Sequence, residues 1–530
     1  MTPIAINGND LALLQLYAVV FDSAPASLAP DARQRMEASR AVIERVIASD
    51  QTVYGVNTGF GELAEIRISR DQIRQLQINL VRSHCCGVGV PLAEPEVRAM
   101  LLLRANTLAK GMSGVRPLVV ETLLAMLNQG VHPLIPAQGS VGASGDLAPL
   151  AHLAAVAIAE GEAIYKGERL PGGEALQRAG VAPLVLEAKE GLSLLNGTQG
   201  MLALLALALR EAEALADTAD VAAALSLDAL QGSPAAFDAR ITAARPFPGA
   251  IQTARNLTLL NHGSTIRESH RSAKKDSRVQ DAYSLRCTPQ VHGAVRDALA
   301  AIRATLTIEL NSATDNPLVF VTESGGHGFS RADSDDKKGG ASAPEVHGEV
   351  ISGGNFHGQP LAMAADQLAV ALATLGGICE RRIEHMTNPN LSLLPPFLTR
   401  DPGLNSGFML AQVTAAALAS ENKPLATPHS VDSIPTSGDK EDYVSMGMSA
   451  ARRLRPMLDN LRHILAIELL CAYQGIDFLA PLRTGSEAQR AYDLVRSVFP
   501  RVDADRPLAP DIAAVARLIT SDALSALLRE

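Results

Sequence analysis

A tripeptide at residues 143–145 has the composition of a backbone that can react with itself. Ala143-Ser144-Gly145 lies in the glycine-rich stretch GSVGASGDLAP. Because glycine has no Cβ, the amide nitrogen of Gly145 can approach the carbonyl carbon of Ala143 in a bend that other residues resist. Ring closure and loss of the Ser144 hydroxyl would leave an exocyclic methylidene, an electrophile that no ordinary side chain supplies. Asp146 follows directly and is placed to move protons; the alternative is an ordinary loop in which Asp146 caps the next helix.

The whole stretch at 139–149 resembles the prosthetic-group loop of the histidine/phenylalanine/tyrosine ammonia-lyase family. The resemblance implies an enzyme, a carbon–nitrogen lyase (ammonia-lyase). It also implies that Ala143, Ser144 and Gly145 form a methylidene-imidazolone (MIO) autocatalytically, with no external cofactor. Asp146 would then support formation of the MIO group.

Two strings in the first hundred residues carry further candidates. Tyr54 begins the string YGVNTGFG and is its only acid/base candidate, although its pKa of about 10 would have to be lowered. Alone it would be a surface tyrosine, but the string resembles the family's inner lid loop, whose tyrosine removes the substrate β-proton. His84 ends the string NLVRSH and could simply cap a helix. The resemblance implies that His84 faces the side chain of the substrate. The Ser-His pair at this position resembles histidine ammonia-lyases and some bacterial tyrosine enzymes.

Two more strings supply groups suited to a carboxylate. Asn196 in LLNGT could be a helix cap, and the resemblance implies that it binds the substrate carboxylate region. Arg286 in QDAYSLRCTPQ offers a planar fork for a carboxylate, although a structural salt bridge is the commoner fate of a loop arginine. The resemblance implies that Arg286 binds the α-carboxylate, that Tyr283 closes over the site from an outer loop, and that Gln280 belongs to the substrate site.

The last strings bear on the substrate. Phe356 in GNFHGQP resembles a family phenylalanine that lines the pocket, and it is also a plausible core aromatic. Glu441 in PTSGDKEDYVSMG stands where the resemblance places Glu for histidine and Gln for phenylalanine or tyrosine. A carboxylate can accept an imidazole N–H, whereas a phenyl ring would leave it desolvated and unpaired. Lys440 could weaken this argument by pairing with Glu441.

The family resemblance therefore favours deamination of L-histidine to trans-urocanate and ammonia. The alternatives are a tyrosine or phenylalanine ammonia-lyase, or an aromatic aminomutase of the same family. A more remote alternative is an inactive helical scaffold, although a degenerate copy should have lost Ser144, Tyr54 or Arg286.

The second half of the chain predicts the long helices that would position these groups. Apolar residues recur at alternating three- and four-residue spacings in residues 291–310, 361–378 and 454–471. Such helices favour an all-α bundle in which some helices are enclosed on all sides. One small hairpin is predicted at 163–170. The resemblance implies a long-helix bundle of the ammonia-lyase/fumarase-aspartase type, in a homotetramer whose active sites draw on three subunits.

The candidate functional loops before residue 205 are Gly-rich, and the helices predicted after it are long, so we predict two domains with a boundary near this residue. Residues 1–205 would form an N-terminal domain with the inner lid loop and the MIO loop, and residues 206–530 a bundle domain with the outer lid loop. The stretch 322–349 is polar, Gly/Ser-rich and almost free of large apolar residues, so it is predicted to be an inserted flexible loop on the surface.

Composition excludes several classes of partner. The formal charge is −9 and no Lys/Arg cluster contradicts it, so no nucleic-acid surface is expected. The five cysteines lack metal-ligand spacing, and no metal is expected. The N-terminus shows no signal peptide, and the longest apolar run, residues 201–209, is far too short to span a bilayer. We therefore expect a cytoplasmic protein that does not bind membranes.

Overall fold

The computed structural model is mostly helical and describes residues 3–49, 53, 55–56, 58, 68–69, 72–271, 278–322 and 347–529. It divides into two compact units. The first comprises Met1–Leu207, Ala304–Met363 and Pro428–Arg452, and the second comprises Ala208–Arg303, Ala364–Thr427 and Arg453–Glu530. The predicted all-α class is confirmed, and the short strands that accompany the helices all lie in the first unit.

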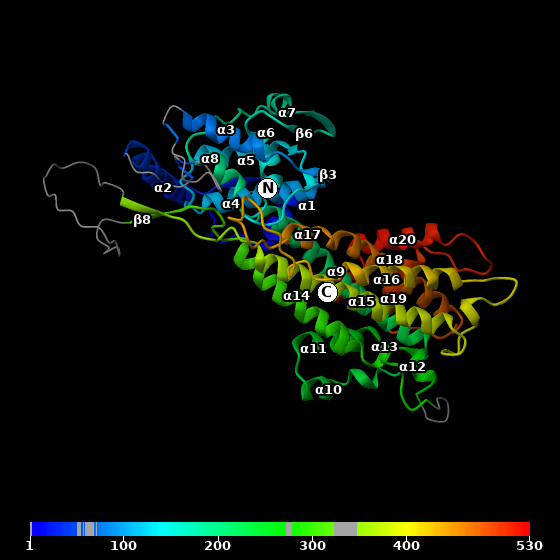
Figure 1. Ribbon diagram of the computed structural model, residues 1–530. Helices are drawn as coiled ribbons and strands as arrows, with labels where there is room; N and C mark the ends of the chain where they lie inside the picture. The colour runs from blue at the N-terminus through cyan, green and yellow to red at the C-terminus, as the bar shows by residue number, and fades with distance from the viewer. Residues whose placement is uncertain are drawn as a thin grey trace. The chain divides into compact units, whose positions relative to one another are not determined.

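The first unit is a layered group of short helices edged by small sheets. In Figure 1, α3, α6 and α8 lie together in this unit, with α7 and β6 beside α6. Its helices are α1 (Leu13–Phe21), α2 (Pro30–Ala48), α3 (Ile73–His84), α4 (Glu94–Ala109), α5 (Pro117–Gln129), α6 (Leu147–Ala157), α7 (Gly172–Ala179), α8 (Glu190–Leu195) and α17 (Gly447–Arg452).

The second unit is built from helices alone within the described residues. Its α16, α18 and α20 pack side by side (Figure 1). Its α-helices are α10 (Ala239–Ala244), α11 (Pro248–Leu260), α12 (Thr265–Ser269), α13 (Tyr283–Arg286), α16 (Met409–Leu425), α18 (Leu454–Asp477), α19 (Ser486–Arg496) and α20 (Ala509–Thr520); its 3-10 helices are η3 (Pro234–Phe237), η4 (Pro396–Leu398) and η5 (Ser525–Leu528). Three helices contribute residues to both units: α9 (Gln199–Ala229), α14 (Thr288–Glu309) and α15 (Gln359–Thr387).

The three long helices predicted from apolar spacing are present as α14, α15 and α18. On α18, the predicted stripe is fully buried, including the polar interruption Glu468, which pairs with the buried Arg382 of α15. A carboxylate is tolerated inside this helix because a guanidinium neutralises it there. Burial of the apolar stripe supplies the main stabilisation of such helices.

Small sheets connect the helices of the first unit. The predicted hairpin at 163–170 is confirmed as β6 (Glu162–Tyr165) and β7 (Glu168–Pro171), and β4 (Val131–Pro133) extends it to three strands. The sequence did not predict three further antiparallel or parallel pairs. They are β1 (Ile4–Ile6) with β2 (Ala26–Leu28), β3 (Val88–Pro91) with β5 (Pro136–Gln138), and β8 (Leu318–Thr322) with β9 (His347–Ile351).

The single boundary predicted near residue 205 falls close to Leu207, where the first stretch of the first unit ends. However, Ala304–Met363 and Pro428–Arg452, which the two-domain division gave to the bundle, cluster with the first unit. The chain returns there because β8 packs on α2 and the residues before α17 pack on the loop after β5. A single boundary drawn from a change in composition cannot reveal that later segments of the chain belong to the first unit.

Among the described residues, one helix is long and apolar enough by composition to cross a membrane. This helix is α15, with a mean hydropathy of 1.6 over its most apolar window. In the structure 61% of the α15 window is buried inside the protein, which is the pattern of a core helix.

The inserted loop predicted at 322–349 lies outside the described residues except at its ends. Those ends meet, because Thr322 and His347 are paired Cα partners at the open end of the β8–β9 ladder. The hairpin fixes the strands on either side of the insertion independently of the residues between them.

We expect replacement of residues 324–344 by a Gly/Ser linker to leave turnover and assembly near wild type. The replaced residues are too poor in apolar side chains to fill a core, and the closing entropy of a loop depends only weakly on its length. Turnover and size-exclusion elution of the variant provide the test. A large loss of activity with unchanged assembly would instead make this segment a lid or a binding element.

Candidate active site

The reactive tripeptide lies in the loop that joins β5 to α6. Its upstream half is held by the segment that precedes α17, since the backbone N–H of Met446 donates to the carbonyl of Val141 at 2.9 Å. The Ser445 hydroxyl donates to the carbonyl of Gly142 at 3.1 Å. Ala143 packs with Val141, Met446 and Val444 in a small apolar cluster. The loop is thereby pinned just before the tripeptide.

The downstream half of the loop is pinned against Gly197. The backbone N–H of Asp146 donates to the carbonyl of Gly197 at 2.7 Å, and Gly145 forms an isolated bridge with Gly197. Gly145 has φ +75°, and a Cβ placed on it would lie 2.1 Å from the Gly197 oxygen. Only glycine fits this conformation and this close approach. The tripeptide is thus held in a tight bend between two anchors, which fits a backbone that must close on itself.

Asp146 occupies the N-cap position of α6, but its carboxylate does not cap that helix. Instead Oδ2 accepts the backbone N–H of Met201, in the first turn of α9, at 2.7 Å, and Oδ1 accepts the Ser140 hydroxyl at 3.0 Å. The alternative of an ordinary capping aspartate is therefore wrong. Complete burial raises the pKa of Asp146 to about 6 against the lowering effect of these hydrogen bonds. The carboxyl group can both gain and lose a proton near neutral pH.

The raised pKa predicts how stability depends on pH. The native state binds the Asp146 proton more tightly than the unfolded state, so the free energy of unfolding should fall by about 3 kcal/mol as pH rises from below 4 to above 6. Ser144→Ala and Ser144→Ala/Asp146→Asn, neither of which can complete the MIO group, form the matched pair. Their melting temperatures should diverge between pH 4 and pH 7, with the aspartate protein losing stability. Parallel curves would contradict the assignment.

The structure brings Glu441 to the reactive serine. The Ser144 hydroxyl donates to Oε1 of Glu441 at 3.2 Å, and the Thr436 hydroxyl donates to Oε2 at 2.7 Å. Backbone hydrogen bonds between Thr436 and Glu441 in both directions fix the carboxylate. Within the described part of the chain Glu441 forms no ion pair, so Lys440 does not neutralise it. A carboxylate therefore faces the position where the electrophile would form.

Of the two candidates in the first hundred residues, the structure describes His84 but not Tyr54. His84 is the last residue of α3, and its Nδ1 lies 2.8 Å from the carbonyl of Leu80 and 3.0 Å from the Ser83 hydroxyl. This contact satisfies the end of the helix and leaves Nε2 as the ring atom available to a ligand. Tyr54 lies outside the described residues.

Asn196 is the C-cap residue that follows α8, and it is 4% exposed. Its Nδ2 donates to the carbonyl of Asn316 at 3.0 Å, while its buried Oδ1 has no hydrogen-bond partner among the described residues. A buried polar atom without a partner is costly, so this one points to a ligand. The neighbouring Gly197 is the anchor of the reactive loop, so Asn196 lies beside the tripeptide.

Gln280, Tyr283 and Arg286 lie together in the second unit. Nη2 of Arg286 donates to Oε1 of Gln280 at 3.0 Å, and its guanidinium lies 4.5 Å from the centroid of the Tyr283 ring. The Tyr283 side chain is 71% exposed. No carboxylate pairs with Arg286 in the described residues, so the salt-bridge alternative does not account for it.

Phe356 lies half-buried in the turn before α15. The next residue, His357, stacks on Tyr443 with ring centroids 6.2 Å apart, and its Nε2 lies 3.2 Å from the Tyr443 carbonyl. A Cβ on Gly358 would lie 2.9 Å from the Ser445 hydroxyl oxygen. The turn that carries Phe356 therefore packs against the segment that holds the reactive loop.

Three hydroxyl groups at this site were not singled out from the sequence. Ser140 links the backbone N–H of Gly142 to the carboxylate of Asp146, Ser445 holds the Gly142 carbonyl, and Thr436 orients Glu441. Ser140 lies inside the glycine-rich string and could have been found there. Ser445 and Thr436 act through contacts that only the folded chain creates.

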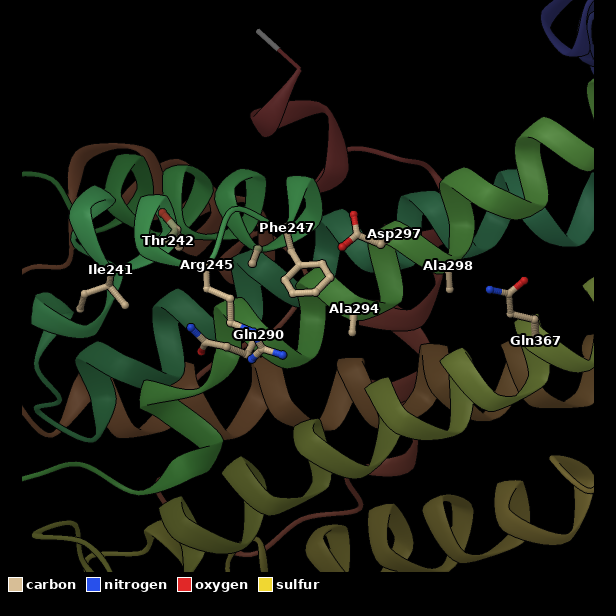
Figure 2. Close-up of a pocket in the computed structure, with 10 residues that line it drawn as sticks. Ile241, Thr242, Arg245, Phe247, Gln290, Ala294, Asp297, Ala298 and Gln367 are labelled. Atoms are coloured by element: carbon tan, nitrogen blue, oxygen red, sulfur yellow. The ribbon is translucent and has the colours of Figure 1, made fainter.

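A separate cavity of about 370 Å³ lies in the second unit (Figure 2). Its lining includes Arg245, stacked 5.0 Å from the centroid of Phe247, and Asp297, which accepts the backbone N–H of Gly249 at the start of α11. None of the predicted site residues that the structure describes lines it. In the described ranges no group of three or more His, Cys, Asp or Glu side chains is arranged to hold a metal ion.

Comparison with known proteins identifies the family. The model of the aromatic amino acid lyase family matches residues 11–497. The chain belongs to the aromatic amino acid lyase family. This lyase is 55% identical to the histidine ammonia-lyase of Koribacter versatilis (strain Ellin345), over 100% of both chains. The family is the MIO-dependent one, as the glycine-rich loop predicted.

Solved structures agree with the fold of this lyase. It matches the crystal structure of histidine ammonia-lyase from Trypanosoma cruzi with a TM-score of 0.88 and 42% identity, covering 100% of this chain and 95% of that one. It matches tyrosine aminomutase from Streptomyces globisporus with a TM-score of 0.90 and 38% identity, covering 100% and 98%. The fold is therefore shared by members with different reactions, and the site must distinguish them.

Proposed function

We propose that this lyase deaminates L-histidine to trans-urocanate and ammonia. The observation that carries the proposal is the Glu441 carboxylate at hydrogen-bond distance from Ser144, with no cation paired to it among the residues that the structure describes. An imidazole N–H can donate to this carboxylate, whereas the ring of phenylalanine would bury it without a partner. The close relatives named as histidine ammonia-lyases support the same substrate. Comparing turnover of L-His, L-Tyr and L-Phe tests it.

Ala143, Ser144 and Gly145 are the residues that would form the MIO group. The amide nitrogen of Gly145 attacks the carbonyl carbon of Ala143 with loss of one water, and Ser144 then loses its α-proton and hydroxyl as a second water. The two anchors at Ser445 and Gly197 support this closure, because they hold the backbone on both sides of the tripeptide before the reaction. The group supplies an electrophile for the substrate amine, which makes nitrogen a better leaving group.

The substrate is held by groups of the chain on either side of the tripeptide. Glu441 and His84 position the imidazole, and Phe356 lines the pocket. Asn196 keeps a free acceptor, suited to the substrate amino group, and one remaining amide N–H, suited to the carboxylate. Tyr54 removes the β-proton as general base.

Arg286 binds the α-carboxylate, and Gln280 orients its guanidinium through the observed hydrogen bond. Tyr283 covers the site from the outer loop. We infer that the active sites form in a cytoplasmic homotetramer and draw residues from three subunits. Tyr283 is exposed, and Arg286 pairs with no carboxylate among the described residues, which is consistent with a site that a neighbouring subunit completes.

The tyrosine or phenylalanine lyase and the aminomutase remain the competing functions. The likeness to tyrosine aminomutase supports them at the level of the fold and of the shared chemistry. The phenol of tyrosine could donate a hydrogen bond to Glu441, whereas phenylalanine has no such donor. Tyrosine is therefore the stronger alternative substrate to histidine. Direct comparison of the three amino acids separates these cases.

A further inference from the structure

Arg104 is a buried cation that the proposed reaction does not use. It lies on α4 and its side chain is fully buried, between Leu103 and Ala105 in an otherwise apolar run. Burial lowers the pKa of Arg104 to about 10, although Asp315 nearby opposes the shift. A charged group in such surroundings is retained only when its hydrogen bonds are specific.

The hydrogen bonds of Arg104 go to the last turn of α8, to the residue that follows this helix, and to Gln199 at the start of α9. Nη1 donates to the carbonyl of Asn196 at 2.9 Å and to Oε1 of Gln199 at 2.6 Å, and Nη2 donates to the carbonyl of Ser193. The planar fork of arginine can make these bonds at once, which the ammonium of lysine cannot reproduce. Gln199 is itself fixed by two threonine hydroxyls, those of Thr107 and Thr314.

The charge of Arg104 is not there to form an ion pair. The nearby carboxylate of Asp315 is already paired with Lys189 at 2.8 Å, and it also accepts the Ser193 hydroxyl at 2.8 Å. In the described residues Arg104 therefore donates to neutral oxygens only. The desolvation cost of the buried guanidinium is offset by its hydrogen bonds to backbone and side-chain carbonyl oxygens, and not by an ion pair with a carboxylate.

The guanidinium also lies directly behind the anchor of the reactive loop. A Cβ on Gly197 would stand 2.4 Å from Nη1 of Arg104, so the backbone touches the cation. The opposite side of Gly197 accepts the backbone N–H of Asp146 through its carbonyl. Arg104 thus contacts the turn from within, and the turn presents Asn196 and docks Gly145.

We propose that Arg104 is a positioning residue, which holds the segment from Ser193 to Gly197 so that Asn196 meets the substrate and Gly197 anchors the reactive loop. It touches neither the tripeptide nor the substrate. This inference rests on the proposed lyase reaction but not on the choice of histidine.

Arg98 provides a matched control on the same helix. It is also buried, at 7% exposure, and it donates to the backbone carbonyls of Val19 and Val20 at 2.6 and 3.2 Å. These carbonyls belong to α1 and not to the site. Arg104→Lys and Arg98→Lys therefore both remove a buried guanidinium that holds backbone carbonyls, and only the first should affect the reaction.

The test measures KM and kcat. The value of kcat is divided by the fraction of protein that has lost two waters, which the intact mass gives, so that kcat/KM refers to cyclised sites only. Arg104→Lys should lower kcat/KM by about tenfold or more, because misplacement of a substrate-orienting group by a fraction of an ångström is costly. Arg98→Lys should stay within about twofold of wild type, even if both variants melt earlier. The proposal is overturned if Arg104→Lys stays within twofold, or if Arg98→Lys loses as much.

A second variant covers the case in which Arg104→Lys does not fold. Gln199→Met keeps the arginine and the side-chain length but removes the oxygen that accepts from Nη1. It should lower kcat/KM per cyclised site at least about fivefold, and an unchanged value would overturn the proposal. If the wild type prefers another aromatic amino acid, the same comparison is run with that substrate. Failure of the histidine assignment and failure of the Arg104 role are then told apart.

Discussion

Ser144→Ala is expected to abolish nearly all lyase activity, with a loss of about a thousandfold or more in kcat. Alanine has no hydroxyl to lose, so the exocyclic electrophile cannot form, and no other side chain at the site supplies one. Intact-mass measurement should show wild-type protein lighter by two waters. The variant can lose at most the water of ring closure.

Ser39→Ala is the matched control, because Ser39 is a buried serine of the first unit whose hydroxyl donates, among the described residues, only to the carbonyl of Met36, one turn earlier. It should keep both the mass loss and the activity. Freshly folded wild-type protein with an unmodified mass and full activity would contradict self-cyclisation. So would a Ser144→Ala protein that retains most of its turnover.

Glu441→Gln is expected to lower kcat/KM for L-histidine by about two orders of magnitude. The amide keeps the shape of the carboxylate but loses the charge that strengthens the hydrogen bond to the imidazole. The same change should raise turnover of tyrosine or phenylalanine relative to histidine, since an amide is less costly to bury against an aromatic ring than a carboxylate. Steady-state kinetics with the three amino acids measure both effects.

Two controls show whether the effect of Glu441→Gln arises from substrate binding by Glu441. The intact mass of Glu441→Gln should still show the loss of two waters, so that the defect lies in substrate binding and not in cyclisation. Lys440→Gln should leave substrate preference unchanged, because Lys440 is exposed and does not pair with Glu441 in the structure. A histidine turnover that survives Glu441→Gln would mean that another group binds the imidazole.

The parts of the fold that could be predicted are those whose sequences show one apolar and one polar face. This is true of α14, α15 and the first half of α18, and of the β6–β7 hairpin. By contrast α4 is buried along nearly its whole length, from Val97 to Ala109, and its apolar residues therefore show no helical period. The strand pairs β1–β2 and β3–β5 join segments far apart in the chain, which local pattern does not reveal.

The site was predictable where chemistry is written in a short string, as in the glycine-rich loop with Asp146. The hydrogen-bond partners of Asp146 could not be predicted in the same way, because its carboxylate reaches across to the first turn of α9 and not to its own helix. Arg104 gave no signal for a related reason. In the sequence it is one polar interruption of an apolar run, and its partners at Ser193, Asn196 and Gln199 lie about ninety residues later.

The central claim is that this lyase deaminates histidine in preference to tyrosine and phenylalanine, and one measurement tests it most directly. Purified wild-type protein is incubated separately with L-His, L-Tyr and L-Phe, and formation of the conjugated acid is followed by ultraviolet absorbance. The account predicts fast appearance of trans-urocanate from L-His, with kcat/KM for the other two amino acids lower by about two orders of magnitude or more. More efficient deamination of L-Tyr or L-Phe than of L-His would contradict it.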